Sequence, residues 1–225
     1  MNVNVTTDIK DLIKKLDKVQ KKQLPFALSK AINSVAFDCR KTVMGSLDIY
    51  LDRPTPFTKK GVMVQKSTKK NPTAHVGFRG DGFMDAKGGN VAKYMRFQIE
   101  GGTRLPKKAA IPVPFPKNIK LNKYGNLAKN KVKAFLGDKD KYFSGVPRGA
   151  TEPDAGIWER MPPNSRRKKG KRGAATGKIK MVIGWEPKAD YSKRFPFKRL
   201  VEQSVRSNFR RRFESALSGA LKTAR

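Results

Sequence analysis

Two carboxylates and a lysine have a spacing that could support metal-assisted hydrolysis of a phosphodiester bond. Asp154 follows Pro153, and Glu186 precedes Pro187 and Lys188. In this arrangement the carboxylates would hold a divalent metal ion and the lysine would support the attacking water. The pattern is short, however, and Pro187 would interrupt the strand that should present both side chains, because proline has no donor for a strand ladder. A strand that ends in a turn is the simpler interpretation.

Cysteine and histidine are scarce, with Cys39 and His75 the single examples. Structural zinc normally takes four Cys or His ligands, and a Ser/His or Cys/His catalytic pair would have to use His75. We therefore expect Cys39 to be a small buried residue, His75 to be a strand residue, and the protein to need no metal or cofactor. Asp138 and Asp140 form another acidic pair, but the lysines around them indicate a solvated turn.

A strongly basic segment covers residues 164–178, NSRRKKGKRGAATGK, and contains no acid. A phosphate-binding P-loop would need glycine where Arg172 stands, a hydroxyl where Ile179 stands, and a helix in place of the strand expected after Lys178. The sequence therefore predicts an extended loop over 164–177. Its side chains that could contact nucleic acid or a protein partner are Arg166, Arg167, Lys168, Lys169, Lys171 and Arg172.

The charge of the whole chain indicates an anionic partner. With 51 Lys and Arg against 18 Asp and Glu, the 225 residues carry a formal charge of +33, and such a surface attracts DNA, RNA, acidic protein faces or anionic lipid. The sequence marks of zinc fingers, RNA-recognition motifs and basic zippers are absent, so nucleic-acid contact would be independent of base sequence. A solvated face, neutralised by ions or by acidic neighbours, is the alternative. The candidate contact residues near the C-terminus are Arg206, Arg210, Arg211 and Arg212.

Apolar residues are numerous enough for a packed core but not arranged for a membrane. Hydrophobic residues make up 37% of the chain and include 13 Phe, which argues against a disordered chain. No run of about 18 apolar residues is present, and the N-terminal MNVNVTTDIKDL lacks the apolar region of a signal peptide. We therefore expect no membrane anchor, and a protein kept in the cytoplasm or in a particle assembled there.

Apolar spacing predicts helices at both ends of the chain. One stripe runs from Ile9 to Val19, and a longer one begins near Pro25, which suits a first helical turn, and continues to about Tyr50. The two prolines of 52–58, DRPTPFT, predict an extended crossing after that helix. A third stripe, over 197–221, predicts a long C-terminal helix.

The middle of the chain favours strands and loops. Strands are expected at 62–67 and 74–79 as a hairpin-like pair, at 156–161 and at 178–186, and the proline-rich 109–116 can form only an edge strand or an extended segment. The spacing of 91–102 does not decide between helix and strand, and 117–155 is expected to form surface excursions. The pattern indicates an α+β fold, with N-terminal helices and a long C-terminal helix packed on a mostly antiparallel sheet with long basic loops. We expect a single domain over 1–225, with loop-rich excursions at 80–160 and 164–177.

Two stretches resemble a known protein family. ALSKAINSVAFDCR, leading into YLDRPTPFT and a Lys-rich hairpin, and the closing FPFKRLVEQSVRSNFRRRFESALSGALK resemble the minor tail protein Z and tail-completion (neck) family of tailed bacteriophages. The two stretches cover about half the chain, and residues 80–160 have no match in the family. The distinctive motif comprises Asp52, Arg53, Pro54, Thr55, Pro56, Phe57 and Thr58.

The resemblance implies a structural virion protein that acts without catalysis. Such a protein would form a ring of copies at the head-proximal end of the tail or at the head-to-tail joint, with neighbouring tail or connector proteins as partners. Sequence-independent contact with packaged DNA would suit its charge. Two alternatives remain from the residues themselves: a sequence-independent DNA- or RNA-binding protein, and a nuclease of the PD-(D/E)xK type that uses Asp154 and Glu186.

Overall fold

The structure is a computed structural model that describes residues 18–84, 89–107, 109–148, 155–161 and 178–223. Whereas the composition suggested one domain, the chain divides into two compact units. Unit 1 combines Met1–Gly101 with Ser192–Arg225, and unit 2 comprises Gly102–Tyr191. Each unit has its own cluster of buried apolar side chains.

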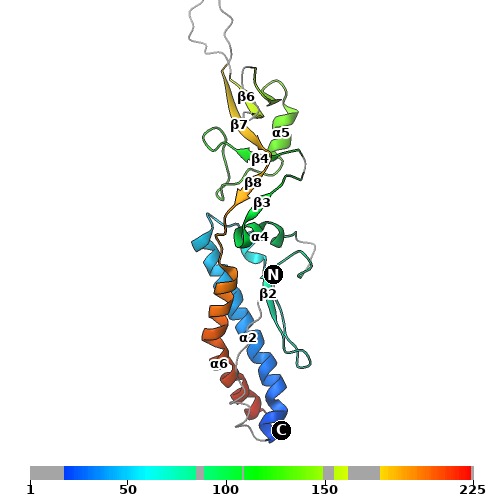
Figure 1. The fold of residues 1–225 in the computed structure, drawn as a ribbon, viewed down its shortest axis with the longest axis vertical. Helices are drawn as coiled ribbons and strands as arrows, with labels where there is room; N and C mark the ends of the chain where they lie inside the picture. Colours follow the sequence, from blue (N-terminus) through cyan, green and yellow to red (C-terminus); the bar gives the residue numbers. More distant parts are fainter. Residues whose placement is uncertain (1–17, 85–88, 108, 149–154, 162–177, 224–225) are drawn as a thin grey trace, which may run out of the picture. The chain divides into compact units, whose positions relative to one another are not determined.

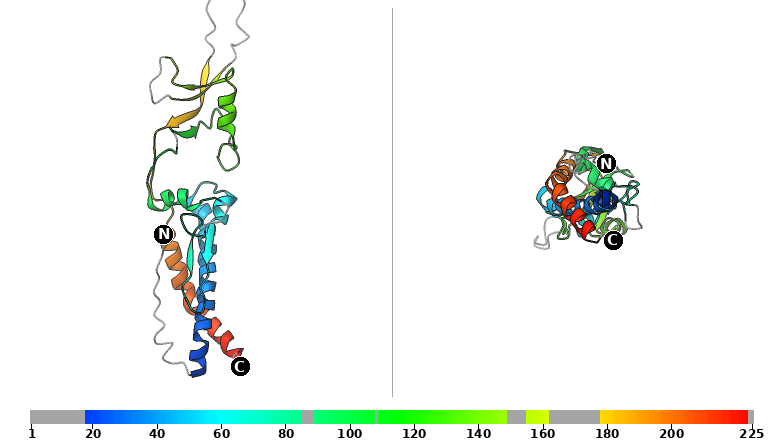
Figure 2. Two further views of the ribbon diagram at one scale, coloured as in Figure 1. Left: turned by 90° about the vertical axis from the view of Figure 1, so that its right-hand side faces the viewer. Right: turned by 90° about the horizontal axis from the view of Figure 1, so that it is seen from below.

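Two long helices form the body of unit 1. Helix α2, Lys18–Tyr50, and helix α6, Phe197–Lys222, lie side by side and antiparallel (Figures 1 and 2). Their contact buries apolar side chains spaced three and four residues apart, as an amphipathic helix requires. The fully or nearly fully buried residues of this contact include Ala31, Val35, Cys39, Phe213 and Ala220. The predicted C-terminal helix is thereby confirmed.

The start of α2 differs from the prediction. Pro25 lies inside the helix, not in its first turn, and Lys18–Gln20 already belong to α2; residues 9–17 of the predicted first helix lie outside the described part of the chain. Proline removes one backbone donor. The helix nevertheless continues because Leu24, Ala27 and Leu28, on both sides of the proline, pack on the core of unit 1.

The prediction of an extended crossing over 52–58 is wrong for most of the segment, because residues 51–53 form a bend, with Arg53 at a φ of 46°, and an extended backbone is found at Thr55. Helix α3, Pro56–Lys60, begins within it. Pro56 is the first helical residue, a position at which proline costs no hydrogen bond. Thr55 has an extended backbone and its hydroxyl accepts from the amide of Thr58 at 3.2 Å, so an N-cap followed by proline starts the helix.

A hairpin and a short helix complete unit 1. Strand β1, Val62–Gln65, pairs antiparallel with β2, His75–Phe78, as predicted. Helix α4, Ala92–Glu100, resolves the undecided stretch in favour of a helix. Val62, Phe78, Val91 and Met95 bring these elements into the same apolar cluster as α2 and α6.

Unit 2 contains most of the strands. A two-stranded sheet pairs β3, Gly102–Arg104, with β8, Ala189–Tyr191. A four-stranded antiparallel sheet has the order β4-β7-β6-β5, with β4, Ile111–Pro114, at one edge as its prolines require. The remaining strands are β5, Tyr142–Gly145, β6, Gly156–Arg160, and β7, Ile179–Glu186.

The expectation that 117–155 forms only surface excursions is wrong. Ile119 and Phe135 are buried together with Ile157, Val182 and Ile183 of the sheet. Phe135 belongs to helix α5, Lys131–Gly137, and its ring lies 4.5 Å from that of Tyr142 in β5. A few apolar side chains among many lysines are sufficient to fold this segment, because they pack into the same small core.

The α+β fold class is confirmed, although the strands form three separate sheets and not one. Within the described ranges, no helix combines the length and apolar character needed to span a membrane.

Candidate functional site

The predicted basic residues of α6 differ in what they contact. Arg206 is exposed, while Arg210 pairs with Glu214 one turn later, at 2.9 Å. Arg211 donates to the side-chain oxygen of Asn208 at 3.0 Å. These three guanidinium groups lie at the surface of α6, where they can meet an anion.

Arg212 has a structural partner. Its guanidinium donates two hydrogen bonds of 2.8 Å to the carboxylate of Asp38 on α2, and this carboxylate raises the pKa of Arg212 further above its usual value. A two-point contact of this kind fixes the orientation of both groups. Arg212 therefore joins the two long helices, and its charge is largely committed within unit 1.

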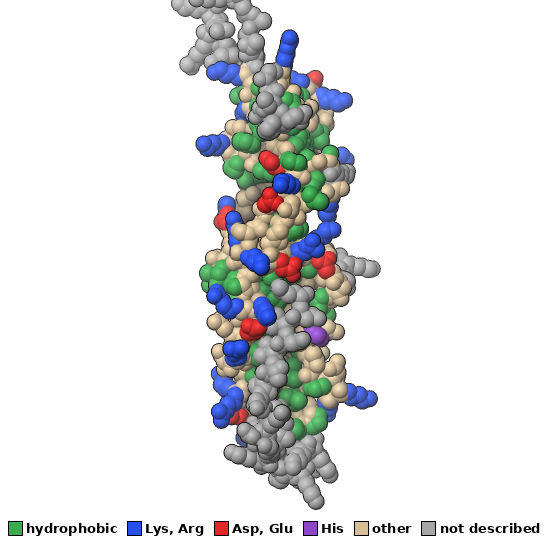
Figure 3. All heavy atoms as spheres, viewed as in Figure 1, with side chains coloured by type: hydrophobic (Ala, Val, Ile, Leu, Met, Phe, Trp, Pro, Cys, Tyr) green, Lys and Arg blue, Asp and Glu red, His purple; other side chains and the backbone are tan. Residues whose placement is uncertain are grey.

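Internal ion pairs occupy many of the acidic side chains. In the described part of the chain, Asp48 pairs with Lys59 at 2.7 Å, and Glu159 lies 2.8 Å from Lys180 and 3.3 Å from Lys141. Burial alone would raise the pKa of Glu159, but the two ammonium groups outweigh it and the pKa is lowered. The excess of Lys and Arg therefore remains available to an external anion, and blue side chains are spread over the face in Figure 3.

Several predicted site residues cannot be placed. Arg166, Arg167, Lys168, Lys169, Lys171 and Arg172 lie outside the described residues, as does Asp154. Glu186 is the exposed last residue of β7, as expected for a strand that ends in a turn. Among the described residues there is no group of three or more His, Cys, Asp or Glu that could hold a metal ion.

The residues predicted to be structural lie where expected. Asp138 caps the end of α5 and its carboxylate accepts from the amide of Lys141 at 3.1 Å, which makes a solvated turn. His75 lies in β2, and Cys39 is 1% exposed. Burial raises the pKa of the Cys39 thiol, which disfavours the nucleophilic thiolate.

The motif of residues 52–58 forms the corner between α2 and the hairpin. Asp52 and Arg53 pair at 2.8 Å at its exposed start, where Arg53 has the unusual φ of 46°. The hydroxyl of Thr58, which is buried, lies 2.9 Å from the hydroxyl of Tyr94 on α4. The motif thus positions three elements of unit 1.

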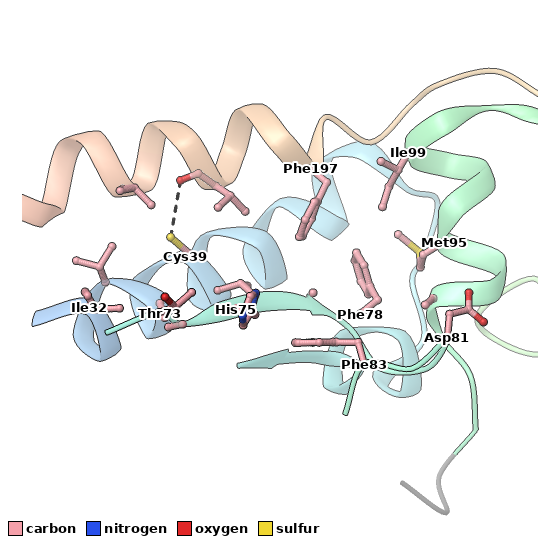
Figure 4. Close-up of a pocket in the computed structure, with 18 of the residues that line it drawn as sticks. Ile32, Cys39, Thr73, His75, Phe78, Asp81, Phe83, Met95, Ile99 and Phe197 are labelled. Atoms are coloured by element: carbon pink, nitrogen blue, oxygen red, sulfur yellow. Dashed lines mark hydrogen bonds between the residues drawn. The ribbon is translucent and has the colours of Figure 1, made fainter. Parts of the chain in front are cut away.

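A cavity of about 610 Å³ lies in unit 1 between α6, α2 and β2, with α4 at one end (Figure 4). Its floor is apolar, with Ile32, Cys39 and Phe197 as examples, and Phe78 and Met95 line the end near α4. Cavities of this size and character bind apolar groups. Besides the buried thiol of Cys39, the charged or titratable side chains at the cavity are His75, Asp81, Arg96 and Glu100.

Phe26 and Phe37 form an aromatic stripe on α2, and lysine side chains contact both rings. Phe26 and Phe37 are 37% and 42% exposed. The ammonium of Lys69 lies 4.9 Å from the ring centre of Phe26, and that of Lys66 lies 5.6 Å from the ring centre of Phe37. These are cation–π contacts. They place positive charge directly beside exposed apolar surface.

Sequence reasoning missed both the cavity and the stripe. The stripe had a detectable pattern, because Phe37 lies eleven positions after Phe26 and three helical turns span about 10.8 residues. Both phenylalanines therefore fall on one face of α2, away from the predicted apolar stripe. The cavity had no such pattern, since it depends on how four separate elements pack.

Comparisons of the chain with known protein families, with curated proteins and with solved structures find no match.

Proposed function

We propose that this protein is a structural component of a tailed-phage virion, in the tail-completion or head-tail joining ring. It acts without catalysis and assists attachment of the tail to the DNA-filled head. Its partners are further copies of itself, neighbouring tail or connector proteins and, without regard to base sequence, packaged DNA.

One observation carries this proposal. The two stretches that resemble the tail-completion family are more than a hundred residues apart in sequence, yet both belong to unit 1. There α2 and α6 pack together, and Asp38 from one stretch holds Arg212 from the other. Most of the middle, without resemblance, forms unit 2. This division is what an insertion into a family-like body would produce.

Charge supports contact with DNA in the same particle. Ion pairs within the chain occupy acidic groups on several elements, including Asp38, Asp48, Glu159 and Glu214. The net charge of +33 therefore needs neutralisation from outside. A ring around a DNA passage supplies it, because phosphate contacts need no base recognition.

The same charge favours a second candidate, a free protein that binds DNA or RNA without sequence preference. The two functions differ in their dependence on salt and on assembly. For the free binder, affinity for DNA falls steeply as the salt concentration rises, because counterions are released from the phosphates. For the virion protein, the chain remains with the particle in washes at high salt, since protein contacts also hold it.

Deletion of the gene in the phage or prophage that encodes the chain tests the proposal. We expect DNA-filled heads and separate tails, visible by electron microscopy, and joined infectious particles when the wild-type gene is supplied in trans. Joined and infectious particles without the chain would contradict the proposal.

A further inference from the structure

The cavity and the aromatic stripe of unit 1 have complementary chemistry. The cavity offers an apolar floor with Asp81 and Glu100 at its edge, against the single guanidinium of Arg96. Among the described residues Glu100 forms no ion pair, and the carboxylate of Asp81 accepts a hydrogen bond from the side-chain amide of Asn90 at 2.6 Å. The stripe offers exposed phenylalanine rings with Lys66 and Lys69 above them, and Lys41 lines the same shallow depression as Phe37.

The two surfaces lie on nearly opposite sides of α2. Cys39 lines the cavity, and Phe37 precedes it by two residues, which is about 200° around the helix axis. Ile32, also in the cavity, is about 140° from Phe37 by the same geometry. Phe37 therefore cannot enter the cavity of its own chain, so a contact between the two surfaces requires a second copy.

We propose that Phe37 of one copy inserts into the cavity of the next copy, with Lys41 and Lys66 facing Asp81 and Glu100. The contact joins two different surfaces, so it repeats head to tail and closes into a ring if the rotation between copies permits. The contact itself follows from unit 1 alone. Its place in a virion ring rests on the proposed function.

Size and charge both fit this occupant. A cavity of about 610 Å³ can accept an aromatic side chain and parts of its helical neighbours. A buried aromatic anchor with a charged rim is typical of the residues that dominate protein interfaces. Because each copy is strongly basic, mutual repulsion opposes association at low salt, and salt screens this repulsion.

Photo-crosslinking of the purified full-length chain tests the contact. With p-benzoylphenylalanine in place of Phe37, and a mixture of ¹⁴N- and ¹⁵N-labelled chains, we expect crosslinks from one chain to cavity peptides of the other. With the crosslinker at Ile99, at the cavity, we expect products with the α2 face around Phe37. Crosslinks from position 99 to residues 1–17 of the same chain would overturn the proposal, because the cavity would then be covered internally.

Two variants give an independent test. Phe37→Ala removes the inserted side chain, and Ala92→Trp fills the cavity, so each alone should associate at least about tenfold more weakly than the wild type in sedimentation experiments. An equal mixture should form one-to-one pairs and nothing larger, because only one complementary contact remains. Ile49→Ala, at a 78% exposed position of α2 outside the stripe, is the control and should associate normally.

Salt separates this contact from nucleic-acid binding. Association of the wild-type chain should strengthen between about 0.05 and 0.5 M salt, as repulsion is screened, whereas DNA affinity should fall. A Phe37→Ala chain that associates as tightly as the wild type would overturn the proposal. That result would not contradict the proposed virion function, which the gene deletion tests separately.

Discussion

At the scale of single residues, Arg212 and Asp38 show how a predicted contact residue can have a structural role. The sequence alone does not show which arginine of α6 has a structural partner. The packing of α2 against α6 distinguishes Arg212 from the others. Arg212 donates two hydrogen bonds across the helix pair, while Arg210 is 87% exposed beside Glu214. The first pair crosses between helices, and the second lies along one helix.

We expect the Arg212–Asp38 pair to be energetically coupled. Arg212→Ala and Asp38→Ala should each lower the thermal midpoint of unfolding, and the double variant should lose less than the sum of both, because each single change already removes the contact. The matched control is Arg210→Ala with Glu214→Ala, an exposed pair for which little coupling is expected. Additive effects at Arg212 and Asp38 would show that the pair does not join the helices.

The Cys39 thiol should make stability depend on alkaline pH. Its pKa is raised by burial, so the folded chain keeps the proton at a pH where the unfolded chain has lost it. This contribution is complete below the unfolded pKa, about 8.5, and is lost as the pH rises through the folded pKa. Relative to Cys39→Ala, the wild type should lose free energy of unfolding above that pH in urea titrations. Parallel pH profiles for the two chains would contradict the assignment.

At the scale of elements, the corner after α2 depends on a helix cap. Thr55→Ala should lower the free energy of unfolding by about 1 kcal/mol, because the amide of Thr58 loses its acceptor at the start of α3. Thr55→Ser keeps the hydroxyl and should retain most of the stability. Equal losses for the alanine and serine variants would mean that the methyl group of Thr55, and not the cap, is what matters.

Elements with regular apolar spacing could be predicted from the sequence. The period of α6 appears in the sequence because one face of that helix is buried, and β1, β2 and β7 appear as short runs that contain β-branched or aromatic residues. The same reasoning missed α5 and β5, where Val132, Phe135 and Tyr142 pack on the core among lysines. It also began the long helix near Pro25, whereas α2 already starts at Lys18, because packing on both sides of the proline overrides the local preference.

For the candidate site, the sequence predicted only the excess of positive charge. Composition gave the excess of Lys and Arg, but the pairing of Asp38 with Arg212 and the apolar cavity depend on contacts between residues distant in sequence. The predicted role of 166–172 remains a prediction, since these residues lie outside the described part of the chain.

At the scale of the whole molecule, the two units should be separable. Gly102 and Tyr191, the first and last residues of unit 2, are paired partners across β3 and β8, so the ends of unit 2 lie about 5 Å apart. Replacement of 102–191 by a short Gly-Ser linker should leave a folded unit 1 with a cooperative unfolding transition by circular dichroism. Loss of helical structure in the shortened chain would show that unit 1 depends on unit 2.

The copy number of the chain in purified particles tests most directly whether the chain is a virion component. Quantitative mass spectrometry of gradient-purified particles should find the chain at a small fixed number of copies, retained in high salt and sedimenting with tails. A chain absent from particles, and recovered free with a DNA affinity that falls steeply with salt, would contradict the account and favour the sequence-independent nucleic-acid binder.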